Sequence, residues 1–299
     1  MYKGISSGQV NLSNGETYYY REYGHGDTIL VLVHGHLSSS RHMAPMFEHF
    51  GEGYRIIAPD MRGFGNSSYN TRIDSLEELS EDIKDFCDLL GIKKAVFGGW
   101  STGGGVLMNL AADYPDLVEK LILIESVSCK GYPVAVYDEN NQITAGKCYA
   151  TKEDMARDPV LVAPIMASLE HRDYEFTKSL WDGAITNVNR LDAREEKALY
   201  EETFKQRSCL DIYWALDRFN ITDDATPASA GNGKVHKIKC PVLASWGDAE
   251  LIIPRYMVDE NIEALDVEVK LVIFENSGHY PIVDCLPRLV GEIDAFIRN

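Results

Sequence analysis

The sequence has no long hydrophobic run and no signal-like start. None of its apolar stretches approaches the roughly 18 uninterrupted apolar residues that a membrane helix needs. The opening residues, MYKGISSGQVNLSNGE, lack the basic, apolar and small-residue regions of a secretory signal peptide. We therefore expect a cytoplasmic protein.

Cysteine is also sparse, because the six cysteines are scattered singly and none belongs to a CxxC pair. In a large chain without a secretion signal, free thiols are expected rather than disulfides. A zinc site built on thiolates is disfavoured for the same reason. The cysteines are Cys87, Cys129, Cys148, Cys209, Cys240 and Cys285.

Basic residues are scarce: 29 Lys and Arg stand against 46 Asp and Glu, which gives a net charge of −17. Such a surface repels phosphate backbones and anionic lipids, so we expect neither a nucleic-acid partner nor a membrane partner. The excess acid is typical of solvated helix faces. The content of 45% hydrophobic and 25% charged residues is that of a soluble globular protein.

Short β-branched and aliphatic runs alternate with helical patterns in the first half of the chain. Four of these runs are continuously apolar: 28–34, 54–60, 95–100 and 120–126. Such strands are typical of a mostly parallel sheet covered by helices on both faces. The sequence therefore predicts an α/β fold. The expected strands are 17–23, 28–34, 54–60, 95–100, 120–126, 240–246 and 267–275. The expected helices of this unit are 75–92, 102–113 and 285–299.

The stretch from 127 to 238 does not follow this rhythm. Residues 132–147 predict a strand-turn-strand, and four helical patterns follow between about 152 and 219. Connections in α/β units usually take about 2–6 residues beyond the crossover helix, so this stretch predicts a structured insertion. We expect residues 1–126 and 239–299 to form the core. Residues 127–238 would form a largely helical cap inserted after the sixth core strand.

A run of glycines surrounds Ser101 in the segment AVFGGWSTGGGVLM. Gly99, Ser101 and Gly103 match G-x-S-x-G between a predicted strand and a predicted helix, the context of a nucleophilic serine. A plain glycine turn is the simpler interpretation. A phosphate-binding P-loop would need Gly-Lys-Ser/Thr, which is absent, and a dinucleotide turn would need G-x-G-x-x-G in the first βα unit.

The segment VHGHLSSS follows an early strand and places His36 where a second oxyanion donor belongs. We assign the backbone N–H groups of His36 and Thr102 to an oxyanion hole, the pair of donors that stabilises the negative oxygen of the reaction intermediate. A metal site on His34 and His36 is the competing interpretation. Two-metal hydrolases of the H-x-H type add an Asp-His pair just downstream, whereas Leu37-Ser38-Ser39 follows here, so we expect no metal.

His279 lies in a loop after the last strand and before the last helix. A lone histidine is often a structural residue. In the chain order Ser, acid, His, however, His279 is the expected general base that takes the proton of Ser101.

With these motifs, the chain resembles α/β-hydrolase-fold serine hydrolases along nearly its whole length. The segment PDMRGFGNS matches the D-x-R-G-x-G-x-S pattern of that family, and the resemblance implies that Asp60 to Ser67 support the active-site loops. The G-W-S-T-G-G box, the RGFGNSSY segment and the long cap are most similar to intracellular polyhydroxybutyrate depolymerase-like esterases. No cofactor is implied.

The third member of the triad departs from the family pattern. The family carries an aspartate in W-G-x-x-D, and the aligned position of Trp246-Gly247-Asp248-Ala249-Glu250 holds a glutamate. Glutamate can orient a histidine as aspartate does, so Glu250 is the expected acid. Asp248 is a nearby rival. Glu125 is a second rival. It lies at the end of the expected strand 120–126, where some relatives place their acid.

The resemblance implies acyl transfer through Ser101, because dehalogenases and epoxide hydrolases of this fold use an aspartate at the same turn. We expect a small-molecule carboxylic ester as the substrate. A lactonase or carbon–carbon bond hydrolase with the same triad, and a receptor-like binding module, are the alternatives. Leu37 and Trp100 flank the site and are expected to line its pocket. The candidate cap aromatics are Tyr132, Tyr137, Tyr149, Tyr174, Trp181, Tyr213, Trp214 and Phe219.

Overall fold

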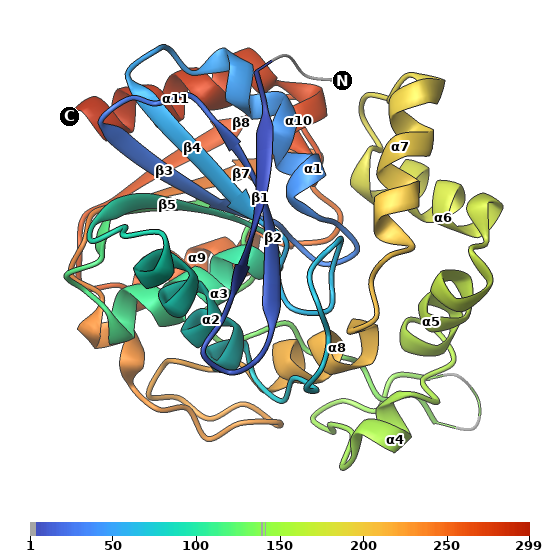
Figure 1. The fold of residues 1–299 in the computed structure, drawn as a ribbon. Coiled ribbons are helices and arrows are strands. Elements are labelled where there is room, and N and C mark those ends of the chain that lie inside the picture. The colour runs from blue at the N-terminus through green and yellow to red at the C-terminus, as the bar shows by residue number, and fades with distance from the viewer. Residues whose placement is uncertain (1–3, 139, 141) are drawn as a thin grey trace.

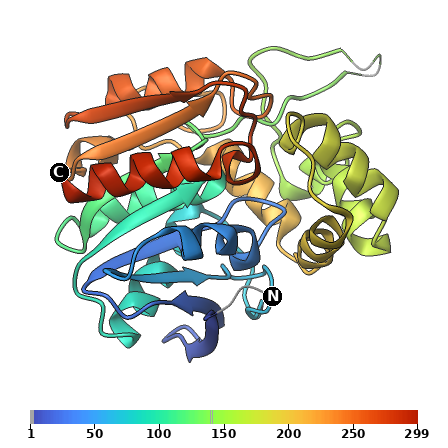
Figure 2. The ribbon, with the colours of Figure 1, turned by 90° about the horizontal axis from the view of Figure 1, so that it is seen from above.

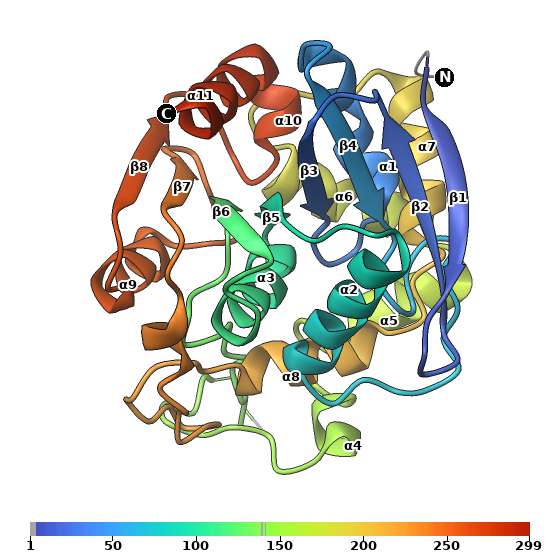
Figure 3. The ribbon, with the colours of Figure 1, turned by 60° about the vertical axis from the view of Figure 1, so that its left-hand side comes forward.

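A single eight-stranded sheet runs through the computed structural model, which describes residues 4–138, 140 and 142–299 (Figure 1). The strand order is β1-β2-β4-β3-β5-β6-β7-β8, and Figure 3 shows the strands following one another in this order. The β1–β2 and β2–β4 pairs are antiparallel and the remaining pairs are parallel. The strands are β1 (Ser6–Asn11), β2 (Thr17–Tyr23), β3 (Thr28–Val33), β4 (Tyr54–Pro59), β5 (Ala95–Trp100), β6 (Val118–Ile124), β7 (Val242–Gly247) and β8 (Val269–Phe274).

Both faces of the sheet are covered, which explains the continuously apolar strands. In β3, Val31 and Val33 pack into a core with the helices α2 and α3. Leu30 and Leu32 point to the opposite face and pack with η1 and α11. The helices outside the insertion are α1 (Ser40–Met43), the 3₁₀ helix η1 (Ala44–His49), α2 (Leu76–Leu89), α3 (Thr102–Asp113), α9 (Arg255–Ala264), α10 (Pro281–Asp284) and α11 (Leu286–Arg298).

The segment between β6 and β7 carries most of the remaining helices. We call residues 127–238 the inserted segment. Figure 2 shows α4 to α7 gathered on one side of the sheet. The helical elements of the inserted segment are α4 (Lys152–Met155), α5 (Val162–His171), α6 (Tyr174–Leu180), a π-helical turn (Trp181–Ile185), α7 (Ala193–Thr203), α8 (Cys209–Arg218) and a 3₁₀ turn (Lys234–Lys237).

The structure corrects the sequence-based prediction at several places. Among its described residues the inserted segment has five α-helices, where four helical patterns were expected. The predicted strand-turn-strand at 132–147 is reduced to an isolated bridge between Tyr137 and Ile143 among the residues described there; residues 139 and 141 lie outside the described residues. The edge strand β1 and the helix α9 were not predicted. Among the helices that the structure describes, none is long and apolar enough to cross a membrane.

Candidate active site

Ser101 stands in the sharp turn between β5 and α3, with a φ of +54°. A positive φ is costly for a residue with a side chain, so the surrounding structure has to hold it. The Ser101 N–H donates to the Ile124 carbonyl at 2.9 Å. A Cβ on Gly99 would lie 2.5 Å from the Gly103 carbonyl group, and a Cβ on Gly103 would lie 2.4 Å from the Val33 oxygen. The turn therefore requires both glycines, as the sequence predicts.

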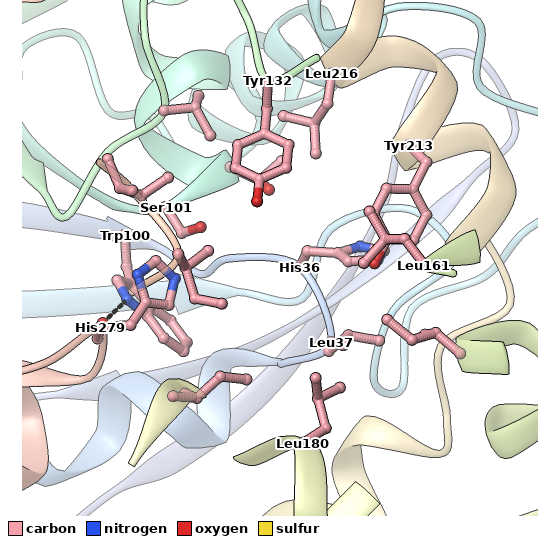
Figure 4. A pocket seen from close by; sticks show the side chains of 16 residues that line it. His36, Leu37, Trp100, Ser101, Tyr132, Leu161, Leu180, Tyr213, Leu216 and His279 are labelled. Carbon is pink, nitrogen blue, oxygen red and sulfur yellow. Dashed lines mark hydrogen bonds between the residues drawn. The ribbon is translucent and has the colours of Figure 1, made fainter. Parts of the chain in front are cut away.

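His279 and Glu250 form a buried hydrogen-bonded pair. Nδ1 of His279 donates to Oε2 of Glu250 at 2.6 Å, and the exposed fraction of the Glu250 side chain is 0%. Trp100 Nε1 donates to the His279 carbonyl at 2.7 Å and so holds the histidine backbone. Because Nδ1 is engaged, Nε2 is the ring nitrogen left for proton exchange. In Figure 4 the Ser101 hydroxyl and the His279 ring lie on the same side of the pocket.

The other two candidate carboxylates have different partners. Asp248 is exposed and accepts a backbone N–H of the turn after β8 at 2.7 Å. Glu125 is buried just after β6, where it accepts the Ser245 hydroxyl at 3.2 Å and the Gly247 N–H at 3.1 Å. Burial, followed by the negative charge of Glu250, raises the pKa of Glu125 well above its ordinary value. Of the three carboxylates, the structure places only Glu250 against the catalytic histidine candidate.

His36, in the loop after β3, lines the pocket. Its backbone N–H has no acceptor within the described part of the chain. Thr102 occupies the first position of α3, where an N–H has no intrahelical acceptor. The N–H of Leu37, in contrast, donates to Gln206 Oε1 at 2.9 Å. The N–H groups of His36 and Thr102 are therefore the ones available to an acceptor in the pocket that both residues line.

His34 is engaged at both ring nitrogens. Nε2 accepts the Met61 N–H at 3.0 Å, and Nδ1 lies 2.8 Å from the Gly35 carbonyl oxygen, to which it donates. Burial lowers the pKa of His34, so the ring is neutral. The lone pair of Nε2 accepts a hydrogen bond and Nδ1 carries the proton, so the His34 ring has no free lone pair for a metal ion.

Asp60 connects two loops beneath the site. Its Oδ1 accepts the Ser40 N–H at 2.7 Å, and its Oδ2 accepts the Asn66 N–H at 2.8 Å. The Ser67 hydroxyl donates to the Asp60 carbonyl at 2.6 Å. The segment from Asp60 to Ser67 thus ties the loop after β4 to the start of α1. The start of α1 directly follows residues 34–39, which we call the oxyanion loop.

One pocket contains Ser101, His279 and both predicted oxyanion residues (Figure 4). Leu37 and Trp100 also line it. Its cavity volume is about 90 Å³, and none of its described lining residues is Lys, Arg, Asp or Glu. The remaining lining residues are Val127, Tyr132, Leu161, Ile165, Leu180, Ile185, Tyr213, Leu216, Ile252 and Ile253.

Sequence reasoning found few of the pocket residues that the inserted segment supplies. Of the candidate cap aromatics, Tyr132 and Tyr213 line the pocket, whereas Trp181 is fully buried against Tyr200, with ring centroids 5.6 Å apart. The aliphatic lining residues of α5, α6 and α8 carry no local signal, because an apolar helix position reads the same whether it faces a pocket or a core. Gln206, which holds the oxyanion loop, was not predicted at all.

Comparison with known proteins identifies the family of the fold. The family model described as alpha/beta hydrolase fold matches residues 28–284. Bifunctional esterase/perhydrolase DCH from Acinetobacter calcoaceticus is 33% identical over 298 residues, which cover 98% of this chain and 100% of that protein. Epoxide hydrolase 4 from Mus musculus is 25% identical over 283 residues, which cover 92% of this chain and 74% of that protein.

A solved structure shares the architecture. The esterase EaEST from Exiguobacterium antarcticum matches with a TM-score of 0.73 at 17% identity, over 97% of this chain and 99% of its own. At this identity the likeness concerns the fold. The eight-stranded sheet, the serine turn between β5 and α3, and a family match over residues 28–284 together show that the chain belongs to the α/β-hydrolase family.

Proposed function

We propose that the protein is a serine hydrolase that cleaves small carboxylic esters through an acyl-enzyme. The observation that carries this proposal is the buried His279–Glu250 hydrogen bond beside Ser101 in one apolar pocket. The similarity to a bifunctional esterase/perhydrolase along the whole chain supports ester chemistry. The serine at the turn also distinguishes the site from the aspartate-dependent hydrolases of this fold.

Catalysis begins when Ser101 Oγ attacks the ester carbonyl carbon and gives its proton to His279 Nε2. Glu250 orients the ring and stabilises the imidazolium that forms. The carbonyl oxygen becomes an oxyanion held by the N–H groups of His36 and Thr102. The C–O bond to the alcohol then breaks, and the leaving alkoxide takes the proton from Nε2. Water activated by His279 hydrolyses the acyl-serine and restores the enzyme.

The pocket favours a short and uncharged substrate. Apart from the reacting groups, the pocket is lined by largely apolar side chains without Lys, Arg, Asp or Glu, so a charged acyl group would be left unpaired there, which is costly. The cavity of about 90 Å³ is smaller than the roughly 150 Å³ cavity that can hold benzene. We infer that the acyl group has only a few carbons, and that short hydroxyalkanoate esters fit as well. The inserted segment acts as the cap that covers this group.

A fluorophosphonate probe with p-nitrophenyl esters from acetate to octanoate tests the proposal. We expect one adduct on the wild type, none on Ser101→Ala, and turnover that falls as the acyl chain lengthens. Hydrolysis of lactones in preference to these esters would replace the esterase with the lactonase alternative. A wild type that is neither labelled nor active, yet binds small apolar ligands, would overturn the proposal in favour of a binding module.

A further inference from the structure

The residue after His36 is held on both sides by the inserted segment. Leu37 has a φ of +56°, a strained conformation for a side chain of this type. Its N–H donates to Gln206 Oε1 at 2.9 Å, and its carbonyl accepts the Thr203 hydroxyl at 2.7 Å. Both partners are buried, with exposed fractions of 4% for Gln206 and 1% for Thr203. The strained backbone is therefore fixed by two side chains from a distant part of the chain.

The same glutamine also holds His36. Gln206 Nε2 donates to His36 Nδ1 at 3.1 Å, which places the ring proton on Nε2. Burial lowers the pKa of His36 to about 3, so the ring keeps this acceptor at neutral pH. On its other side the ring packs against Tyr213 of α8, with ring centroids 4.6 Å apart, and Figure 4 shows the two side chains together. One amide thus fixes both His36 and Leu37.

Two further bonds continue this contact along α7. The Ser39 hydroxyl donates to Glu202 at 3.3 Å, and the Arg41 guanidinium donates to Glu195 at 3.1 Å. The oxyanion loop and the start of α1 are therefore bonded to α7 and to the turn that follows it. A contact of this extent indicates that the loop conformation depends on the inserted segment.

We propose that Thr203 and Gln206 are positioning residues that set the direction of the His36 N–H in the oxyanion hole. This inference rests on the proposed function, because it assigns the two residues a part in the same reaction. An oxyanion donor stabilises the transition state only when it points at the developing charge, and a misplacement of about 1 Å can cost a large part of the rate. The ground-state ester depends much less on that direction.

The test compares Thr203→Val, which keeps the shape and removes the hydroxyl, with Thr203→Ser, which keeps the hydroxyl. Gln206→Met removes both amide bonds at similar size. We expect Thr203→Val and Gln206→Met to lower kcat on p-nitrophenyl acetate about tenfold, with KM changed by less than about twofold. Thr203→Ser should recover most of kcat. Ethylboronic acid, which forms a tetrahedral adduct on serine and is small enough for this cavity, should bind Thr203→Val and Gln206→Met more weakly by a similar factor.

Thr177→Val is the matched control. Thr177 is a buried threonine of α6 in the inserted segment, and its hydroxyl lies 3.0 Å from the Ser168 hydroxyl, with no bond to the oxyanion loop. It should lose thermal stability as Thr203→Val does and keep its kcat. Wild-type kcat in Thr203→Val and Gln206→Met would overturn the inference, as would an equal loss in Thr177→Val. A wild type without Ser101-dependent hydrolysis would instead overturn the proposed function itself.

Discussion

The carboxylate of Glu250 accepts a hydrogen bond from His279 Nδ1 at 2.6 Å, while Asp248, two residues earlier, is exposed at the surface. The chain turns between these two positions, since the Glu250 N–H donates to the Gly247 carbonyl at 3.2 Å. This turn carries the longer glutamate side chain inward. A second bond, from the Ile252 N–H to Oε1, fixes the carboxylate plane.

The glutamate gives the first prediction. Glu250→Gln keeps the size of the side chain but cannot hold the histidine in the required tautomer, so kcat should fall by about 10³ to 10⁴. Glu250→Asp should retain an intermediate rate, because the charge remains on a shorter side chain. Steady-state kinetics on p-nitrophenyl acetate measure both. Asp248→Asn is the control and should behave as the wild type; loss of activity in this variant, with Glu250→Gln intact, would assign the acid to Asp248.

The second prediction concerns the pH dependence of stability. Burial and the Glu250 charge raise the pKa of Glu125 well above its ordinary value of 4.5, so the folded protein keeps a proton that the unfolded chain releases. This contribution is complete below about pH 4.5 and is lost as pH rises through the raised pKa. Glutamine cannot ionise. The free energy of unfolding of Glu125→Gln, relative to wild type, should therefore increase from pH 5 to pH 8.

Urea unfolding at several pH values measures this difference. Glu275→Gln removes a carboxylate from an exposed position and serves as the control. Its curve should run parallel to that of the wild type. If the Glu125→Gln curve were also parallel, the buried carboxyl would have no raised pKa in the folded protein.

The third prediction concerns the length of the acyl group. Leu180 of α6 lines the pocket and is only half-buried, so Leu180→Ala should enlarge the cavity at small cost in stability. The ratio of kcat/KM for p-nitrophenyl octanoate to that for the acetate should rise about tenfold. Phe176→Ala, on the same helix but outside the pocket lining, should leave the ratio unchanged. A ratio that rises equally in both variants would show that α6 does not limit the acyl chain.

The fourth prediction compares alanine substitutions at two glycines, one closely surrounded and one in open space. A Cβ on Gly99 would meet the Gly103 backbone at 2.5 Å, so Gly99→Ala should lower the free energy of unfolding by about 3 kcal/mol. Gly291, in α11, has nothing within 4 Å of such a Cβ. Gly291→Ala should therefore raise it by about 1 kcal/mol. Thermal unfolding of the two variants gives the comparison, and equal Tm values would contradict the close approach at Gly99.

The elements around Ser101 could be predicted because local chemistry determines them. Continuous apolar strands, a glycine-rich turn and an amphipathic helix at 75–92 each leave a pattern within a few residues, and the fold class that they indicate is confirmed. The strand β1 left no such pattern, since SSGQVN is polar and mostly exposed at a sheet edge. Its pairing with β2 depends on the neighbouring strand rather than on its own side chains.

The contacts across the chain could not be predicted from the sequence. Leu37 and its partners Gln206 and Thr203 lie 169 and 166 residues apart, and no local period relates them. For a similar reason the sequence favours Glu250 as the acid without excluding Asp248 and Glu125. Which carboxylate reaches the histidine depends on a turn of a few residues, and composition does not determine that turn.

The hydrogen bonds between the inserted segment and the oxyanion loop also limit which parts of the chain can be exchanged with those of a relative. Exchanging residues 127–238 with the corresponding part of a relative would replace the partners of Leu37 together with the walls of the pocket. A chimaera made in this way should gain a new substrate range only when the segment from His36 to Arg41 is transplanted with it. The inserted segment and residues 36–41 would thus have to be exchanged together, although they are far apart in the chain.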